Sequence, residues 1–464
     1  MSKIRNRLDL AGIILMVVSM TLTLSGSWSH GHDVPHKYSD AEAQKPSPLP
    51  DRINLCITAT PSKSMAVNWR TDLSVNQGLV EIAVAQAGPM FIRSPRQLKA
   101  VSEVLKSDLS EALYHSVVMD QLVPENLYAY RVGDGLNWSE WFHFRAAPTT
   151  PKPFRFIYFG DAQNDVKSLW SRVIRSAFQD APKAALLVHA GDLINSPNRD
   201  VEWGDWFEAA GFINGMMPLL ATPGNHEYSK SPQGPALSKH WRPQFTFPTN
   251  GPAGLEETCY YSDYAGVRFV SLNSNERQQE QVNWLDSILA NNPNRWTILT
   301  FHHPIYSAAK GRDNKSLREM WQPVFDKHKV DLVLTGHDHT YARSGLLIHD
   351  NQMTGTNVRD SKSGTVYVVS VSGPKMYRVD REEWMKRAAE NTQLYQIIEV
   401  DGDRIRYESR TAIGTLYDAF ELVKKPNGQP NELIDKIPNT PERLGDEVRT
   451  SRSQLMDSRR GFTR

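Results

Sequence analysis

The sequence lacks an excess of charge of either sign. Its 464 residues contain 53 Lys and Arg and 52 Asp and Glu, which leaves a formal net charge of +1. A protein that binds a nucleic acid along its backbone carries a strong positive excess that neutralises the phosphates. Nucleic acid is therefore excluded as a partner, and any phosphate chemistry must depend on a local group of residues.

Cysteine is nearly absent, because the chain contains only Cys56 and Cys259. Both lie far from the N-terminus, so lipid attachment to a cysteine directly after a signal sequence is excluded. Two cysteines allow one disulfide in an oxidising compartment, but two free buried thiols suit the sequence at least as well. We therefore do not expect a disulfide.

No apolar run is long enough for a permanent membrane span. The longest N-terminal one, "LAGIILMVVSMTLTL", has 15 residues, whereas a spanning helix needs about 20. The basic "MSKIRNR" precedes it and the small residues of "SGSWS" follow, which is typical of a signal peptide over residues 1–29. We expect export to the periplasm or the extracellular space. Residues 30–50 are interpreted as a polar linker, although His30, His32 and His36 could bind a metal.

Residues 51–147 have the pattern of an all-β domain. Apolar residues alternate in "INLCITA", "MAVNW" and "GLVEIAV", and a hairpin is expected between "LYAYRVGDG" and "SEWFHFRA". Short strands separated by turns predict an immunoglobulin-like or fibronectin-like β-sandwich of about one hundred residues. A stiff, proline-rich linker, "APTTPKP", follows this domain.

Residues 152–424 have a different pattern, in which predicted buried strands alternate with predicted helices. This alternation predicts an α/β (α+β) domain of mixed β-sheets flanked by helices. Ligands bind at the carboxyl ends of the strands in such domains, which is where the polar motifs of this sequence lie. Residues 425–464 are polar and are interpreted as a C-terminal tail that is either an ordered wrap or disordered.

Five short motifs each follow a predicted strand: "GDAQ", "GDLIN", "GNHE", "FHHP" and "GHDH". Each motif alone is common in turns, but all five in order within one domain form a specific pattern. They supply two carboxylates, one amide oxygen and three imidazoles, a set that suits Zn, Fe or Mn better than Ca or Mg. The candidate metal ligands are Asp161, Asp192, Asn225, His302, His337 and His339.

The chain resembles the purple acid phosphatase group of the calcineurin-like metallophosphoesterases, in its plant-type form with an N-terminal fibronectin-like domain. "GNHEY", "FHHPIYS" and "GHDHTYAR" carry the resemblance, which covers most of residues 50–424. It implies two metal ions at one site, with Asp192 bridging them. The first ion would be held by Asp161, Asp192 and His339, and the second by Asp192, Asn225, His302 and His337.

The resemblance also implies a mechanism. A hydroxide that bridges the two metals would attack phosphorus, with Asp192 and His226 as the central catalytic residues. His226 would bind the phosphate or protonate the leaving oxygen. Glu227 would orient His226 or be a surface carboxylate, His303 would point away from the metals, and His189 would be structural.

The sequence departs from the family at two predicted metal positions. Asn195 stands where purple enzymes have the tyrosine whose phenolate binds ferric iron, so we expect a colourless protein. Gln163 replaces a usual glycine, and its amide would bond a metal-bound water or pack locally. Both are possible additional ligands or neighbours of the ligands.

A third departure concerns the substrate. Lys310 and Arg312 stand where plant-type members have a further histidine pair, and they are interpreted either as phosphate-binding groups or as solvated loop charges. The leading hypothesis is an exported phosphomonoesterase acting on a small phosphorylated substrate. Two alternatives stay open, a phosphodiesterase with the same site and a non-catalytic binding protein that the metals stabilise. The sequence carries no signal for an oligomeric state.

Overall fold

The computed structural model describes residues 38–348, 364–426 and 429–445. The predicted signal peptide and His30, His32 and His36 lie outside these residues. Residues 1–43 form one unit, of which the short helix α2 (Asp40–Ala43) is described, and the chain from Gln44 onward forms a second compact unit. Within the described ranges, no helix is both long enough and apolar enough to cross a membrane.

The predicted β-sandwich is built from two antiparallel layers. One layer is a separate sheet of four strands, in the order β4 (Arg96–Lys99), β3 (Leu79–Val84), β7 (Leu127–Gly133) and β8 (Phe142–Arg145). The other layer consists of β1 (Asp51–Cys56), β2 (Met65–Thr71), β6 (Glu111–Met119) and β5 (Val101–Lys106). Leu55, Val67, Trp69 and Ile82 are fully or almost fully buried between the layers, as their alternation predicts.

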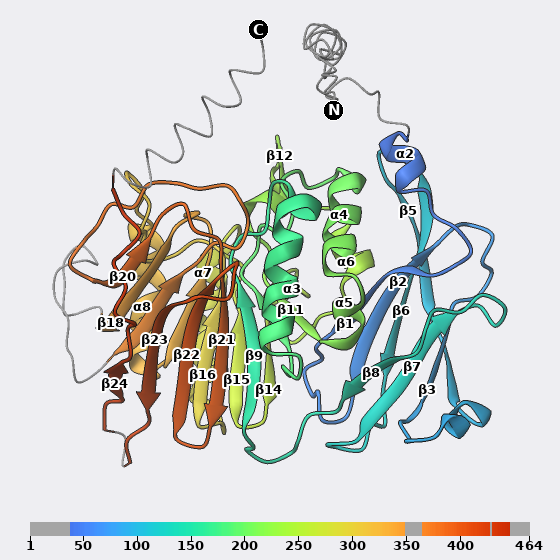
Figure 1. The fold of residues 1–464 in the computed structure, drawn as a ribbon, viewed down its shortest axis with the longest axis horizontal. Coiled ribbons are helices and arrows are strands. Elements are labelled where there is room, and N and C mark those ends of the chain that lie inside the picture. Colours follow the sequence, from blue (N-terminus) through green and yellow to red (C-terminus); the bar gives the residue numbers. More distant parts are fainter. Residues whose placement is uncertain (1–37, 349–363, 427–428, 446–464) are drawn as a thin grey trace, which may run out of the picture. The chain divides into compact units, whose positions relative to one another are not determined.

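The second layer does not end at the edge of the sandwich. β1 pairs in parallel with β11 (Leu219–Ala221), with Cys56 opposite Leu219. The layer thus continues into an 11-stranded sheet (Figure 1). The further strands, in order from β11, are β10 (Leu187–His189), β9 (Phe154–Phe159), β21 (Leu394–Asp401), β22 (Arg404–Thr411), β23 (Leu416–Val423) and β24 (Glu432–Asp435).

A second sheet of seven strands packs against this one. It contains β14 (Tyr260–Tyr264), β15 (Val267–Ser271), β16 (Trp296–Thr300), β17 (Leu332–Thr335), β19 (Thr365–Val369), β18 (Tyr341–Leu347) and β20 (Met385–Ala389). Phe156 and Tyr158 of β9 belong to the same buried cluster as Phe269 and Ile298 of the second sheet. The predicted arrangement of mixed sheets flanked by helices is confirmed.

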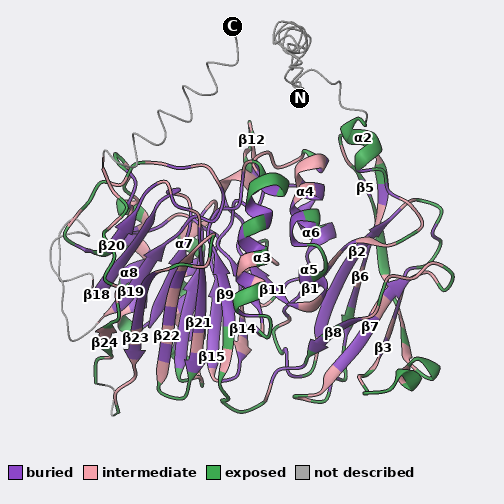
Figure 2. Ribbon diagram, in the orientation of Figure 1, coloured by how far each residue is buried: buried purple, intermediate pink, exposed green. Residues whose placement is uncertain are grey.

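The helices cover the outer faces of the two sheets. α3 (Ser171–Asp180) follows a π-helical turn at Val166–Trp170 and packs with α4 (Asp200–Ala210) over the first sheet. α7 (Gln278–Ala290) and α8 (Lys315–Lys327) form a second core with the outer face of the seven-stranded sheet. The strands are largely buried, whereas α3 exposes one side (Figure 2). The remaining short elements are η1 (Pro89–Arg93), α5 (Phe212–Met216), η3 (Asn225–Glu227), β12 (Tyr228–Ser231), β13 (Gly234–Leu237) and α6 (Trp241–Gln244).

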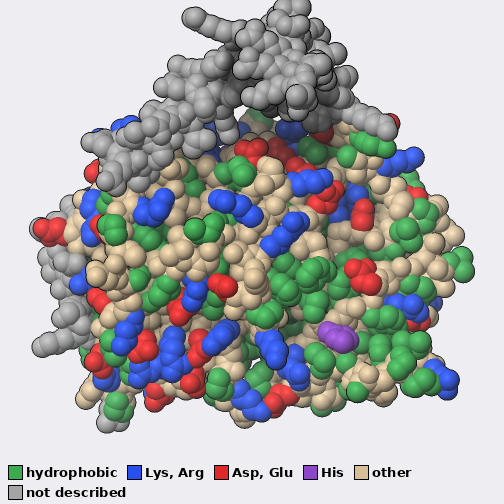
Figure 3. Space-filling model, in the orientation of Figure 1, with side chains coloured by type: hydrophobic (Ala, Val, Ile, Leu, Met, Phe, Trp, Pro, Cys, Tyr) green, Lys and Arg blue, Asp and Glu red, His purple; other side chains and the backbone are tan. Residues whose placement is uncertain are grey.

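Three expectations from the sequence can be compared with this fold. Cys56 and Cys259 are both buried and free, in line with the expectation of no disulfide. Lys and Arg side chains are interspersed with Asp and Glu on the face shown in Figure 3, as expected from the balanced charge. Part of the predicted tail is described, and its strand β24 pairs with β23.

Candidate active site

The five motifs meet because their strands end at the same edge of the two sheets. β10 lies between β9 and β11 and is parallel to both, and β16 is parallel to β17 in the other sheet. The carboxyl ends of parallel strands lie at the same edge of a sheet, so the loops that follow them are neighbours. The first three strands lead to Asp161, Asp192 and Asn225, and the other two lead to His302 and His337.

Asp192 lies at the centre of the site and is 1% exposed. Its Oδ2 is 3.1 Å from Nε2 of His302, and its Oδ1 accepts a hydrogen bond from the backbone N–H of His226 at 2.8 Å. The same His302 nitrogen is 3.0 Å from Oδ1 of Asn225 and 3.1 Å from Nδ1 of His337. The four residues predicted for the second metal therefore converge on one point.

The residues predicted for the first metal also lie close to Asp192, because ligand atoms of Asp161, Asp192 and His302 are all within 4.8 Å of one another. Nε2 of His339 is 3.3 Å from Oδ2 of Asp161. The amide nitrogen of Gln163 lies 2.9 Å from Oδ2 of Asp192 and 2.9 Å from Nε2 of His339. Asp192 thus borders both groups, as a bridging ligand would.

Backbone carbonyl groups set the orientation of two imidazoles. Nδ1 of His302 is 2.9 Å from the carbonyl oxygen of Ala190, and Nδ1 of His339 is 3.0 Å from that of Lys375. A neutral imidazole that donates its Nδ1–H to a carbonyl leaves the Nε2 lone pair free for a metal. Both Nε2 atoms point into the predicted metal site.

Two loops of the site pass so close to a neighbouring carboxylate that only glycine, which has no side chain, fits there. A Cβ atom on Gly224 would lie 2.1 Å from Oδ1 of Asp192, and one on Gly336 would lie 2.1 Å from Oδ1 of Asp161. Asp192, His337 and His339 also have positive φ angles of 52°, 72° and 48°. Non-glycine residues adopt this conformation rarely, and such strain concentrates at functional sites.

The buried charges of the site are not balanced by protein cations alone. Burial raises the pKa of Asp161, with His302 opposing the shift and the charge of Asp192 adding to it. Burial lowers the pKa of His302, but the charges of Asp192 and Asp161 outweigh it and raise the pKa to about 9. Asp161 Oδ2 and Gln163 Oε1 are buried and accept no hydrogen bond from the described residues. Unpartnered buried oxygens beside carboxylates and imidazoles fit a site for metal cations.

His226 is held by a backbone group rather than by Glu227. Its Nδ1 is 2.5 Å from the carbonyl oxygen of Asn195, while its Nε2 lies 4.0 Å from Oδ2 of Asp192 and the side chain is 25% exposed. The expectation that Glu227 orients His226 or lies on the surface is wrong. Glu227 is fully buried and accepts hydrogen bonds from the backbone N–H groups of Asp192, Leu193 and Gly224.

Three further predicted residues have clear surroundings. The side chain of Asn195 bonds Asn164 and Ser196 rather than any predicted ligand. The expectation that His303 points away is wrong, because its ring lies 4.3 Å from that of His337 and a ligand atom of each clusters with one of His302. His189 packs against Trp170 and Trp206, in a structural position.

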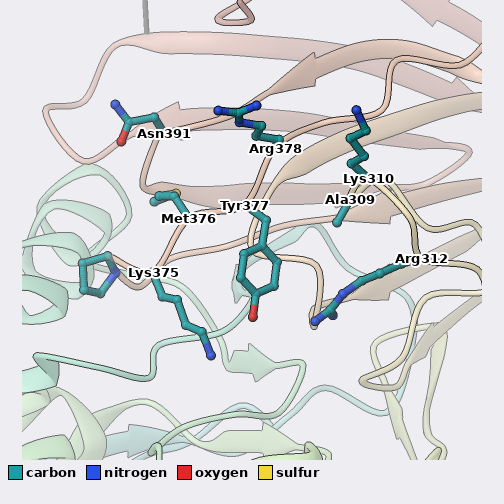
Figure 4. Close-up of a pocket in the computed structure, with 9 residues that line it drawn as sticks. Ala309, Lys310, Arg312, Lys375, Met376, Tyr377, Arg378 and Asn391 are labelled. Atoms are coloured by element: carbon teal, nitrogen blue, oxygen red, sulfur yellow. The ribbon is translucent and has the colours of Figure 1, made fainter. Parts of the chain in front are cut away.

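A basic cavity of about 670 Å³ lies beside the ligand histidines, and Lys310 and Arg312 line it together with Lys375, Tyr377 and Arg378 (Figure 4). Arg312 donates a hydrogen bond to the carbonyl oxygen of His337 at 3.1 Å. No pattern in the sequence pointed to Lys375, Tyr377 and Arg378, because they lie on a loop without periodicity between β19 and β20.

The comparison with protein families assigns both parts of the chain. Residues 154–341 match the calcineurin-like phosphoesterase family, and residues 50–146 match the N-terminal domain of purple acid phosphatases. Acid phosphatase type 7 of Homo sapiens is 28% identical over 334 residues, which cover 64% of this chain and 71% of that protein. Purple acid phosphatase 18 of Arabidopsis thaliana is 24% identical over 356 residues, covering 72% and 76%.

Solved structures show the same fold. A purple acid phosphatase from yellow lupin (Lupinus luteus) seeds superimposes with a TM-score of 0.69 at 20% identity, covering 82% of this chain and 75% of its own. PhoD superimposes with a TM-score of 0.61 at 14% identity, covering 89% and 99%. An uncharacterised protein of Mycobacterium tuberculosis is 27% identical over 365 residues, or 67% of each chain.

Proposed function

Since the chain belongs to the purple acid phosphatase family of calcineurin-like phosphoesterases and is a metal-dependent phosphoester hydrolase, we propose that it is an exported phosphatase that hydrolyses phosphomonoesters. The observation that carries the proposal is that Asp192 adjoins both groups of predicted metal ligands. The signal-like N-terminus of the sequence supports export.

Two metals, drawn from Fe, Zn or Mn, fit the donor set of the site. Asp161, Asp192 and His339 would hold one, and Asp192, Asn225, His302 and His337 would hold the other. Such ions supply an acidified water as nucleophile and stabilise negative charge on the phosphoryl oxygens.

Protein cations beside the site favour a monoester over a diester. Burial is the main cause that lowers the pKa values of His337 and His339. The charge of Lys375 adds to the effect on His339, and the charges of His302, His303 and Arg312 add to the effect on His337. A phosphomonoester carries up to two negative charges and a diester only one, so positive groups attract the monoester more strongly. The cations thereby add binding energy for the substrate with two charges.

The position of His226 suits it to protonate the leaving group. The carbonyl of Asn195 holds Nδ1, which leaves Nε2, 4.0 Å from Oδ2 of Asp192, as the ring nitrogen available to a substrate. A protonated Nε2 can donate its proton to the oxygen of a departing alcohol. His226 is therefore assigned as the general acid.

The test uses metal-stripped protein reconstituted with Fe, Zn or Mn, alone and in pairs. We expect hydrolysis of 4-nitrophenyl phosphate to require metal, to exceed that of bis(4-nitrophenyl) phosphate, and to fall to background in Asp192→Asn. The exposed Asp380→Asn is the control variant. A preference for the diester would support the phosphodiesterase alternative. Absence of turnover with two ions bound per chain would support the binding-protein alternative.

A further inference from the structure

The cavity beside the site contains more positive charge than one phosphate requires. Lys310, Arg312, Lys375 and Arg378 all line it, and none of its lining residues is acidic. Of these four, only Arg312 has a carboxylate oxygen within 4 Å, Oδ1 of Asp338 at 3.6 Å, among the residues that the structure describes. The remaining cations are therefore free to bind an anion from solution.

The four cations fall into two groups that point in different directions. In Figure 4 the ends of Arg312 and Lys375 extend to the same side as the Tyr377 hydroxyl, whereas Lys310 and Arg378 extend to the opposite side. Arg312 and Lys375 also lie over the Tyr377 ring, at 4.7 Å and 5.7 Å from its centre. Tyr377 thus separates an inner pair from an outer pair.

The inner pair adjoins the metal ligands. Arg312 bonds the carbonyl oxygen of His337, and the carbonyl of Lys375 holds His339. These contacts place the inner pair next to the phosphoryl group that reacts. The outer pair is brought together by the backbone, because the N–H of Lys310 donates to the carbonyl oxygen of Arg378 at 3.0 Å.

We propose that Lys310 and Arg378 form a subsite for a second anionic group, so that the preferred substrates are small organic molecules that carry two phosphates. The proposal rests on the proposed phosphatase function and names its substrate class. Both outer side chains are exposed, so the subsite is open to solvent and its attraction is sensitive to ionic strength. A cavity of about 670 Å³ has room for a small bisphosphate but not for a macromolecule.

The experiment compares 1,6-hexanediol bisphosphate with hexyl phosphate, which have the same type of scissile bond. The measured quantity is the ratio of their kcat/KM values from phosphate release by the metal-loaded protein. Two equivalent ends give a statistical factor of two, and a second charge-assisted contact adds about tenfold or more. We expect the ratio to fall to about two in Lys310→Gln/Arg378→Gln. It should stay high in the control Arg175→Gln/Lys183→Gln, which removes two exposed cations elsewhere.

A ratio near two in the unchanged protein would overturn the proposal, and so would a high ratio that the double variant retains. Binding of hexane-1,6-bisphosphonic acid and hexylphosphonic acid, measured by calorimetry, tests the subsite without turnover. If neither ester is hydrolysed, the proposed function fails. Tighter binding of the bisphosphonic acid that depends on Lys310 and Arg378 would still support the subsite, whereas equal binding of the two acids would overturn it.

Discussion

The carboxylate of Glu227 accepts a hydrogen bond from the backbone N–H of Asp192, at an O···N distance of 2.8 Å. The same carboxylate accepts from Leu193 and Gly224, so one buried side chain ties the loop of Asp192 to the loop of Asn225. The relative position of two predicted metal ligands thus depends on a residue that is not itself a predicted ligand.

Replacement of Glu227 by Gln should weaken metal binding. The amide has one acceptor oxygen, so at least one of the three N–H groups loses its partner and the loops shift. We expect affinity for metal to fall by about 10- to 100-fold, measured as metal content against a competing chelator. Glu280→Gln, at an exposed position of α7, is the control. Unchanged metal affinity in the Glu227 variant would contradict the assigned role.

Replacement of His226 by Asn should affect substrates according to their leaving groups. An alkoxide needs a proton to leave, whereas 4-nitrophenolate does not. We expect kcat for hexyl phosphate to fall by about 10²- to 10⁴-fold and kcat for 4-nitrophenyl phosphate to fall much less. The exposed His143→Asn is the control. Equal losses on both substrates would indicate that His226 binds phosphate instead.

The iron-loaded protein should be colourless. Asn195 stands at the position of the family's ferric-binding tyrosine, and a neutral amide supplies no phenolate charge-transfer band. The visible spectrum of the pure, reconstituted protein checks this expectation. Tyr377 lies 4.7 Å from the His339 ring between ring centres. A visible band that disappears in Tyr377→Phe would therefore contradict the prediction and identify the phenolate.

Replacement of Gln163 by Ala should weaken the binding of one of two metals. The Gln163 amide bridges Asp192 and His339 and leaves its oxygen unpartnered. The unpartnered oxygen lies beside both predicted ligands and can accept a hydrogen bond from a water on the metal. Alanine removes this contact, so we expect a loss of about tenfold or more. Calorimetric titration should show two unequal sites in the variant. Gln393→Ala, a half-buried position away from the motifs, is the control, and identical titrations would refute the role.

Replacement of Glu257 by Gln should stabilise the protein above neutral pH. Burial raises the Glu257 pKa to about 7, although Arg242 opposes the shift. A carboxyl whose folded pKa is raised contributes stability below its unfolded pKa, near 4.5, and that stability is lost as pH rises through 7. We expect no difference near pH 4.5 and a gain of up to ~3 kcal/mol above pH 8. Denaturant unfolding across this range measures it, with exposed Glu383→Gln as control. A gain that does not vary with pH would contradict the assignment.

The candidate ligands could be found from the sequence because they follow strands. Asp161, Asp192 and Asn225 come directly after three buried apolar runs, and parallel strands bring such positions to one edge. The role of Glu227 could not be found in this way. Its partners are backbone N–H groups, which every residue except proline has, so no pattern of side chains marks them.

The pairing of strands in the β-sandwich also could not be predicted fully from the sequence. Alternation in β1 and β2 predicted strands and a buried face, but pairing of β1 with β11 joins residues 163 positions apart, as Cys56 and Leu219 show. Edge strands pair with whichever strand the tertiary packing brings beside them. The alternation of apolar residues within β1 does not indicate which strand will pair with it.

The sequence by itself indicated a β-sandwich followed by mixed sheets, the family and the set of candidate metal ligands, because strand periodicity and motif order are properties of neighbouring residues. The tertiary structure alone decided which atoms face the site. In the folded chain the carbonyl of Asn195 contacts His226, and the ring of His303 lies beside that of His337. Lys375 and Arg378 line the same cavity as Lys310. These relationships join loops distant in the chain, and only the packing of the two sheets fixes their distances.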